Sequence, residues 1–342
     1  MRPPFFTRLF FWLILGLFST FFAEVVSASS PFVFFTPFGL VGTYPIYLLH
    51  TLVLGTLVIR RSRQVSLQAL YFAGGIFGLY EAYITKVLWS PPWDTTTLHV
   101  AGISVLDTVV LVGFWHAFMS FIVPLFAGEL FLLRSNKLMR CLPEKWQAFL
   151  RRPAGVWVLA GVIGLWQGIA AGQYAVVSAL ANALVLLVFI FLWQRLTRGR
   201  AYDWQDLLPN RIEWLVLLAL LAGYYLVFGF NVRADAVPGL GGQLTIWVMY
   251  AIWGTLLWLA LRVAPTEAEP IEPAFTIPPV RTWLKFMLGF GLISLVVSLL
   301  VLPVRNVAFG AIWAVVLLAG AVALVWMTVS VLKQNHRFEK LN

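Results

Sequence analysis

Charged side chains are scarce in this sequence of 342 residues. Only 11% of the residues are charged, whereas 61% are hydrophobic, and the mean hydropathy is +0.88. In a soluble globular protein about a quarter of the residues are charged. Several stretches of about twenty residues here carry no charge at all, and that length spans a bilayer as a helix. The composition therefore excludes a water-soluble domain and predicts an all-α, polytopic integral membrane protein.

Cysteine is almost absent as well. The single cysteine, Cys141, excludes an intramolecular disulfide bond and a metal site built from cysteines. We expect Cys141 to be a free thiol in a cytoplasmic loop. The outer loops are short and contain no N-glycosylation sequon, which is compatible with the cytoplasmic (inner) plasma membrane of a bacterium or archaeon.

Apolar runs that are long enough to cross the hydrocarbon core recur ten times along the chain. About 30 Å of hydrocarbon requires roughly twenty helical residues at about 1.5 Å each. The predicted spans cover residues 9–28, 38–59, 66–89, 107–133, 154–172, 174–194, 212–231, 244–262, 283–302 and 307–332. We expect one membrane domain over 1–342, in which 1–133 (spans one to four) hold a polar pocket and 134–342 (spans five to ten) form a scaffold.

The basic residues, which give the chain a formal net charge of +10, lie in short clusters between the apolar runs. When the N-terminus is placed in the cytoplasm, all but three of the 24 Lys and Arg residues fall on the cytoplasmic side; the three are Lys86, Arg233 and Arg305. This asymmetry predicts ten spans with both termini in the cytoplasm, and it explains the charge without nucleic acid. Alternatively, residues 1–28 are a cleaved signal peptide, which would leave nine spans.

Two ionisable side chains lie deep within predicted spans, where burial is costly and usually serves a function. Glu81 lies eight residues before Trp89 in span three, and His116 lies nine residues after Asp107 in span four. If Trp89 and Asp107 mark the outer boundary, both side chains sit about 12–14 Å below it. Consecutive spans are antiparallel and usually adjacent, so we expect Glu81 and His116 to meet.

Helical spacing places suitable neighbours beside this pair. Gly74 and Gly78 share a face with Glu81, and small residues let two helices approach closely. Thr85 continues the same face, and Ser120 lies one turn after His116. The sequence therefore predicts that both ionisable side chains face protein and not lipid.

Further polar groups lie on spans one and two, where Tyr47 and His50 form a stripe and Glu24 lies at the outer end of span one. The candidate catalytic residues are Glu81 and His116; the candidate binding residues are His50, Tyr47, Thr85, Ser120 and Glu24. As a metal site, Glu81, His116 and His50 would be a sufficient donor set for a divalent ion with one open position. Alternatively, these groups only bond one another to fix helix packing.

Three expectations concern packing. Lys86 is turned away from Glu81 and is expected to reach the outer headgroups. Glu129 lies near the cytoplasmic boundary and is expected to be interfacial. Small residues recur at every fourth position of span five and are expected to pack against span six; they are Ala160, Gly164, Gly168 and Gly172.

The pattern of Glu81 followed thirty-five residues later by His116 resembles the CAAX-protease and bacteriocin-processing family of intramembrane proteases. The resemblance covers spans three and four and implies a membrane-embedded, metal-dependent hydrolase. The sequence also departs from the family's pattern. Ala82 replaces a second glutamate, Val112 stands where a phenylalanine precedes the histidine by four, and no later span contains a histidine.

Three functions are compatible with these features. The first is a transporter-like carrier of a small solute, ion or proton, in which the Glu81 and His116 side chains bind and release the proton or cation. The second is the metal-dependent hydrolase. The third is an accessory membrane subunit of a larger complex or a homo-oligomer, which the 16 tryptophans and the small-residue ridges indicate.

Overall fold

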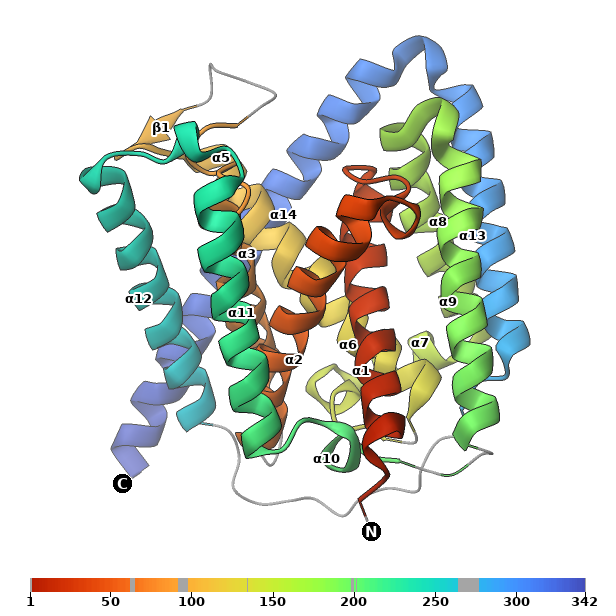
Figure 1. Ribbon diagram of the computed structural model, residues 1–342, viewed down its shortest axis with the longest axis horizontal. Helices are drawn as coiled ribbons and strands as arrows, with labels where there is room; N and C mark the ends of the chain where they lie inside the picture. Colours follow the sequence, from red (N-terminus) through yellow and green to blue (C-terminus); the bar gives the residue numbers. More distant parts are fainter. Residues whose placement is uncertain are drawn as a thin grey trace. The chain divides into compact units, whose positions relative to one another are not determined.

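The computed structural model describes residues 2–61, 65–91, 98–133, 135–197, 200, 202–263 and 277–341. Almost all of these residues are helical (Figure 1). The chain forms two compact units, and each is assembled from three segments. Unit one comprises Met1–Leu48, Val123–Pro209 and Glu269–Ile312; unit two comprises Leu49–Ile122, Asn210–Ala268 and Trp313–Asn342. Both units take residues from each side of position 133, so they do not follow the division into 1–133 and 134–342.

Unit one contains long α-helices joined by short helical turns, which are labelled η. Its elements are α1 (Phe5–Thr20), η1 (Phe21–Val25), η2 (Val33–Phe35), η3 (Gly39–Thr43), α6 (Val123–Leu132), η5 (Met139–Cys141), α7 (Glu144–Arg151), α8 (Pro153–Ala171), η6 (Gly172–Tyr174), α9 (Ala175–Thr197), α10 (Trp204–Leu207), α13 (Val280–Leu300) and η8 (Leu302–Val304). Figure 1 shows α8, α9 and α13 side by side, and α13 packs against both of the others.

The small-residue ridge of α8 packs mainly against α13 and not against α9 as predicted. A Cβ atom on Gly164 would lie 3.0 Å from Ile293 Cβ, and one on Gly168 would lie 2.7 Å from the Ser294 carbonyl oxygen. Glycine is therefore required for this close approach. Aromatic rings fill the rest of the core, where the buried Trp283 ring lies 4.7 Å from that of Phe286.

Unit two contains a two-stranded hairpin in addition to its helices. Its elements are α3 (Leu67–Gly78), α4 (Tyr80–Tyr83), β1 (His99–Val100), β2 (Ile103–Ser104), α5 (Val105–Asp107), η4 (Thr108–Ile122), α11 (Arg211–Asn231), η7 (Ala234–Ala236) and α12 (Leu240–Arg262). The strands pair in an antiparallel register, with His99 opposite Ser104. Two α-helices, α2 (Tyr44–Arg61) and α14 (Arg305–Leu341), contribute residues to both units.

Close packing between α3 and η4 defines the centre of unit two. A Cβ atom on Gly74 would lie 2.7 Å from Ala117 Cα, and one on Gly78 would lie 3.0 Å from both Val112 Cα and His116 Cβ. The structure thus confirms the close approach that the two glycines predict. The helix η4 is wound with i→i+5 hydrogen bonds, a form that recurs at functional sites.

Eight segments among the described residues are long and apolar enough to cross a membrane, and this supports an all-α polytopic membrane protein. The number differs from the ten predicted for two reasons. Residues 153–197 count as one segment, but Gly172 at φ +55° separates α8 from α9. The predicted third span stops being helical after Tyr83, which leaves α3 with only 12 residues.

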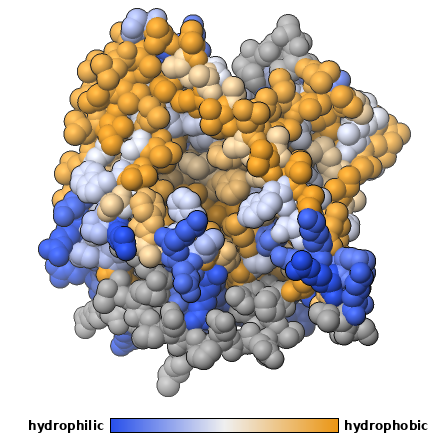
Figure 2. All heavy atoms as spheres, turned by 180° about the vertical axis from the view of Figure 1, so that it is seen from behind, coloured by the Kyte–Doolittle hydropathy of each residue, from blue (hydrophilic) through white to orange (hydrophobic). Residues whose placement is uncertain are grey.

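The helix α11 shows how strongly some elements depend on an apolar environment. It begins at a capping box. The Asn210 side chain accepts a hydrogen bond from the Glu213 backbone N–H, and the Glu213 carboxylate accepts one from the Asn210 backbone N–H. Only Leu221 in this helix is buried, whereas Ile212 is 73% and Phe230 76% exposed. Apolar side chains also cover most of the face in Figure 2, and hydrophilic ones gather toward one end. These surfaces are suited to hydrocarbon and not to water.

Candidate functional site

The structure brings Glu81 and His116 together inside unit two. Glu81 lies on α4 and His116 on η4, and the carboxylate Oε1 is 2.8 Å from the imidazole Nε2. Both residues are buried, with exposed fractions of 7% and 1%. The depth of the two residues in their predicted spans and the glycine contacts between α3 and η4 account for this meeting.

A hydroxyl group extends the pair at each end. The Thr85 hydroxyl donates to Glu81 Oε2, and it also lies 3.0 Å from the Glu81 carbonyl oxygen. The Ser120 Oγ atom is 2.8 Å from His116 Nδ1. Thr85, Glu81, His116 and Ser120 therefore form one continuous hydrogen-bonded chain, which we call the Glu81–His116 relay. Each imidazole nitrogen and each carboxylate oxygen has a partner within it.

Aromatic rings surround the imidazole of the relay. The Tyr80 ring lies 5.0 Å from that of His116, at an interplanar angle of 82°, and the Phe77 ring lies at 5.7 Å. Tyr80 also lies within hydrogen-bonding reach of the Glu81 carboxylate. These rings exclude water and lower the local dielectric, so the hydrogen bonds of the relay are stronger than they would be in solvent.

His50 is close to the relay but has a different partner. Its Nε2 atom is 2.9 Å from the Tyr225 hydroxyl on α11, and the Tyr225 hydroxyl is 3.4 Å from that of Tyr250 on α12. The His50 ring stacks on Phe77 with 4.5 Å between centroids. Tyr225 and Tyr250 are not among the predicted site residues, although each places a tyrosine hydroxyl inside an apolar span, which is a usable signal.

The expected three-ligand metal site is not assembled. Among the residues that the structure describes, no group of three or more His, Cys, Asp and Glu side chains lies close enough to hold a metal ion. His50 is directed to Tyr225 instead of completing a set with Glu81 and His116.

The remaining two candidate residues, Glu24 and Tyr47, form a separate cluster in unit one. The Tyr47 hydroxyl donates to Glu24 Oε1 at 2.5 Å, and the Ser29 hydroxyl donates to Glu24 Oε2 at 2.5 Å. Glu24 is half-buried in the π-helical turn η1. The Glu24 carboxylate is thus held by hydroxyl groups of two other residues.

Two charged residues are placed differently from their predictions. Lys86 has no exposed surface, and its ammonium group donates to backbone carbonyls near the end of α11 instead of reaching headgroups. Glu129 is only 1% exposed and accepts hydrogen bonds from the backbone N–H groups of Leu138 and Met139 and from the indole of Trp204. A carboxylate with this many donors is not an interfacial group.

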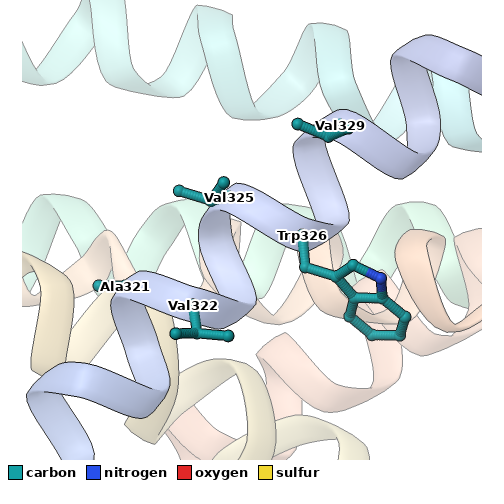
Figure 3. A pocket seen from close by; sticks show the side chains of 5 residues that line it. All are labelled: Ala321, Val322, Val325, Trp326 and Val329. Atoms are coloured by element: carbon teal, nitrogen blue, oxygen red, sulfur yellow. The ribbon is translucent and has the colours of Figure 1, made fainter.

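A shallow hollow on α14 has no polar chemistry. Five residues line it, and Figure 3 shows their side chains along one helix: Ala321, Val322, Val325, Trp326 and Val329. The lining is apolar, and Val322, Val325 and Trp326 are largely exposed. This surface suits lipid chains and contributes no group to the relay.

Comparison with known proteins gives a family and one relative. The sequence model of a family described as "Uncharacterized membrane protein family" matches residues 13–340. An "Uncharacterized protein" of the archaeon Archaeoglobus fulgidus is 34% identical over 263 residues, which are 76% of this chain and 79% of the relative. No solved structure matches the chain.

Proposed function

We propose that this chain, which belongs to that family of uncharacterized membrane proteins, is a carrier whose Glu81–His116 relay takes up and releases a proton. It is a multi-pass membrane protein, and all four residues of the relay belong to its second unit. The observation that carries the proposal is the 2.8 Å hydrogen bond between a buried carboxylate and a buried imidazole.

The relay can hold a proton in two ways without leaving an unpaired charge. With one proton between them, the pair is either carboxylate and imidazolium or carboxylic acid and neutral imidazole. Imidazole is the side chain whose ordinary pKa lies closest to neutral pH, so a modest change of environment moves the proton between these forms. Thr85 and Ser120 orient the carboxylate and the ring throughout, because each hydroxyl can rotate to donate or accept.

The packing of the relay also favours a proton over a larger ligand. The two groups contact each other directly, and His116 and Ser120 have exposed fractions of 1% and 0%. A proton can enter such a site along hydrogen bonds, whereas a solute would require the helices to separate. Buried ionisable groups of this kind are typical of proton relays in pumps and transporters.

The test is proton flux in proteoliposomes that contain a trapped pH-sensitive dye. Purified wild-type protein should carry protons when a membrane potential is applied, and Glu81→Gln and His116→Gln should reduce the flux to that of empty vesicles. Glu24→Gln is the matched control, because it makes the same substitution at a carboxyl group in unit one that accepts from the Tyr47 and Ser29 hydroxyls. That variant should retain the flux.

Thermal unfolding of each variant shows whether lost flux reflects lost folding. Wild-type protein without flux, or Glu81→Gln with normal flux, would refute the proposal. If flux is absent and Ser120 reacts with a fluorophosphonate, the Ser120–His116–Glu81 sequence of contacts instead indicates a membrane-embedded hydrolase.

A further inference from the structure

Two basic residues near the relay, Lys86 and Arg233, are joined through hydrogen bonds to the main chain. Lys86 follows α4, and Arg233 follows α11. Each side chain donates hydrogen bonds to backbone carbonyls of the segment that carries the other. We call this reciprocal arrangement the Lys86–Arg233 clasp. It lies entirely within unit two.

Lys86 closes the end of α11. Its Nζ atom lies 2.7 Å from the Gly229 carbonyl oxygen and 3.3 Å from that of Phe228, and it also donates to the carbonyl of Val232. The last carbonyls of a helix carry partial negative charge, and most of them lack a backbone partner within the helix; the Phe228 carbonyl here also accepts from the Val232 backbone N–H. The buried ammonium satisfies them, and they in turn compensate for its burial.

Arg233 holds the segment that follows α4. Its Nη1 atom donates to the Thr85 carbonyl oxygen at 3.1 Å, and its Nη2 atom donates to the Ser90 carbonyl oxygen at 2.6 Å. Nη2 also contacts the Ser90 hydroxyl at 3.2 Å. The guanidinium therefore joins the two ends of a short non-helical stretch that begins at a member of the relay.

Both residues of the clasp have left-handed backbone conformations. The φ angle is +58° at Lys86 and +46° at Arg233. Residues with a side chain rarely adopt this region, and the conformation persists only where the surroundings impose it. Here the hydrogen bonds of the two side chains supply that restraint. Each side chain binds the main chain around the other residue and so holds that residue in its left-handed conformation.

We propose that the Lys86–Arg233 clasp is a positioning device that holds the Thr85 hydroxyl on Glu81 and thereby sets the proton affinity of the relay. The inference rests on the proposed proton-carrying function. Arg233 binds the main chain of Thr85, and the Thr85 side chain donates to the Glu81 carboxylate. A hydrogen bond to the ionised carboxylate favours that form. Releasing the clasp therefore makes Glu81 accept a proton at higher pH.

Several other titratable and charged groups lie near Glu81 or the clasp, and replacing Arg233 leaves all of their side chains in the sequence. His116 from η4 is its direct partner, and Tyr80 lies on its own helix. Tyr225 from α11 is close enough to interact electrostatically with Glu81, and its hydroxyl forms a hydrogen bond with His50 from α2. Asp235 is the acidic group beside Lys86. The variants are chosen so that these contacts stay the same.

The experiment measures protonation of Glu81 directly by infrared spectroscopy. The carboxylic acid C=O band of detergent-solubilised protein is followed against pH and is assigned to Glu81 by its loss in Glu81→Gln. Arg233→Ala should move the midpoint of this band upward by about one pH unit, which is about a tenfold change in proton affinity. Arg233→Lys, which retains one charged donor, should restore part of the shift.

Arg305→Ala is the matched control. Arg305 also donates to carbonyls at a helix end, those of Ile169 and Ala170 at the end of α8, but it does so in unit one. Its loss should lower thermal stability by an amount similar to that for Arg233→Ala and leave the midpoint unchanged.

The outcomes separate the two proposals. A band that shifts equally in Arg233→Ala and Arg305→Ala, or in neither, refutes the clasp while the proton site stands. A wild-type protein in which no carboxyl band depends on Glu81 refutes the proton site itself. If Arg233→Ala does not fold, Arg233→Lys replaces it, because a lysine cannot make the two-pronged contact with the Thr85 and Ser90 carbonyls. The midpoint should then rise by less than one pH unit, and an unchanged midpoint refutes the clasp.

Discussion

Glu129 in unit one and Glu81 in unit two are both buried carboxylates, and they are held by different kinds of donor. Glu129 in unit one accepts from the Leu138 and Met139 backbone N–H groups at 2.9 Å and from Trp204 Nε1 at 2.6 Å. Glu81 in unit two is bonded instead by an imidazole and a hydroxyl. Backbone and indole N–H groups are donors only and do not ionise near neutral pH, whereas an imidazole can gain or lose a proton there.

The donors to each carboxylate distinguish a structural role from a chemical one, whereas the exposed fraction does not. Both carboxylates are less than a tenth exposed. Glu129 fixes the loop before α7, because its donors come from residues 138 and 139 and from α10. Glu81 shares its proton network with groups that can change protonation state or rotate. A buried acid in a membrane protein is therefore better classified by its donors than by its depth.

The largest expected effect is on Glu129. Glu129→Ala leaves three buried N–H groups without an acceptor, which should cost about 3 kcal/mol or more of folding free energy. Glu81→Gln should cost much less, because an amide can still bond the imidazole and the hydroxyl. Thermal unfolding and size-exclusion chromatography of the detergent-purified variants measure the difference. Equal stability of the two variants would remove the distinction between the carboxylates.

A second prediction concerns the close packing that brings the relay together. Gly74→Ala places a Cβ atom 2.7 Å from Ala117 Cα on η4, so the helices must move apart. We expect a loss of about 1–3 kcal/mol in stability and reduced proton flux. Gly113→Ala is the control on η4 itself, because its nearest neighbour would be 3.6 Å away. The prediction fails if the two alanine variants behave alike.

The smallest effect is chemical and lies in unit one. Burial, together with the nearby charge of Glu129, raises the pKa of the Cys141 thiol to about 12. The thiol thus stays protonated below that pH, and at pH 8 roughly one molecule in ten thousand carries a thiolate. Iodoacetamide should modify native Cys141 about a thousandfold more slowly than the chain unfolded in detergent. Similar rates in both states would show that the loop held by Glu129 opens readily.

The sequence was sufficient to predict the membrane class and the meeting of Glu81 with His116. Bilayer thickness and helical rise fix the depth of each side chain, and glycine spacing fixes the face on which α3 can approach η4. It did not predict that α4 ends at Tyr83, because a left-handed lysine leaves no local signal. The burial of Lys86 follows from that early ending.

Contacts between residues that are far apart in the chain could not be predicted from the sequence either. Small residues on α8 suit any closely packed helix, so the choice of α13 over α9 depends on the whole bundle. The pairing of His50 with Tyr225 joins residues 175 positions apart. No periodicity encodes such a contact. The polar stripe of Tyr47 and His50 suggested one shared site, whereas the two side chains bond Glu24 and Tyr225 respectively.

The length of α14 has a mechanical consequence. It runs for 37 residues without a break, about 55 Å at 1.5 Å per residue, which exceeds the roughly 30 Å of a hydrocarbon core. Within unit two, a Cβ atom on Gly320 would lie 2.6 Å from the Val109 carbonyl oxygen at the start of η4. The helix that carries His116 therefore packs against the middle of a continuous helix. A displacement of the last turns of α14 would reach η4 through α14 itself, with no loop in between.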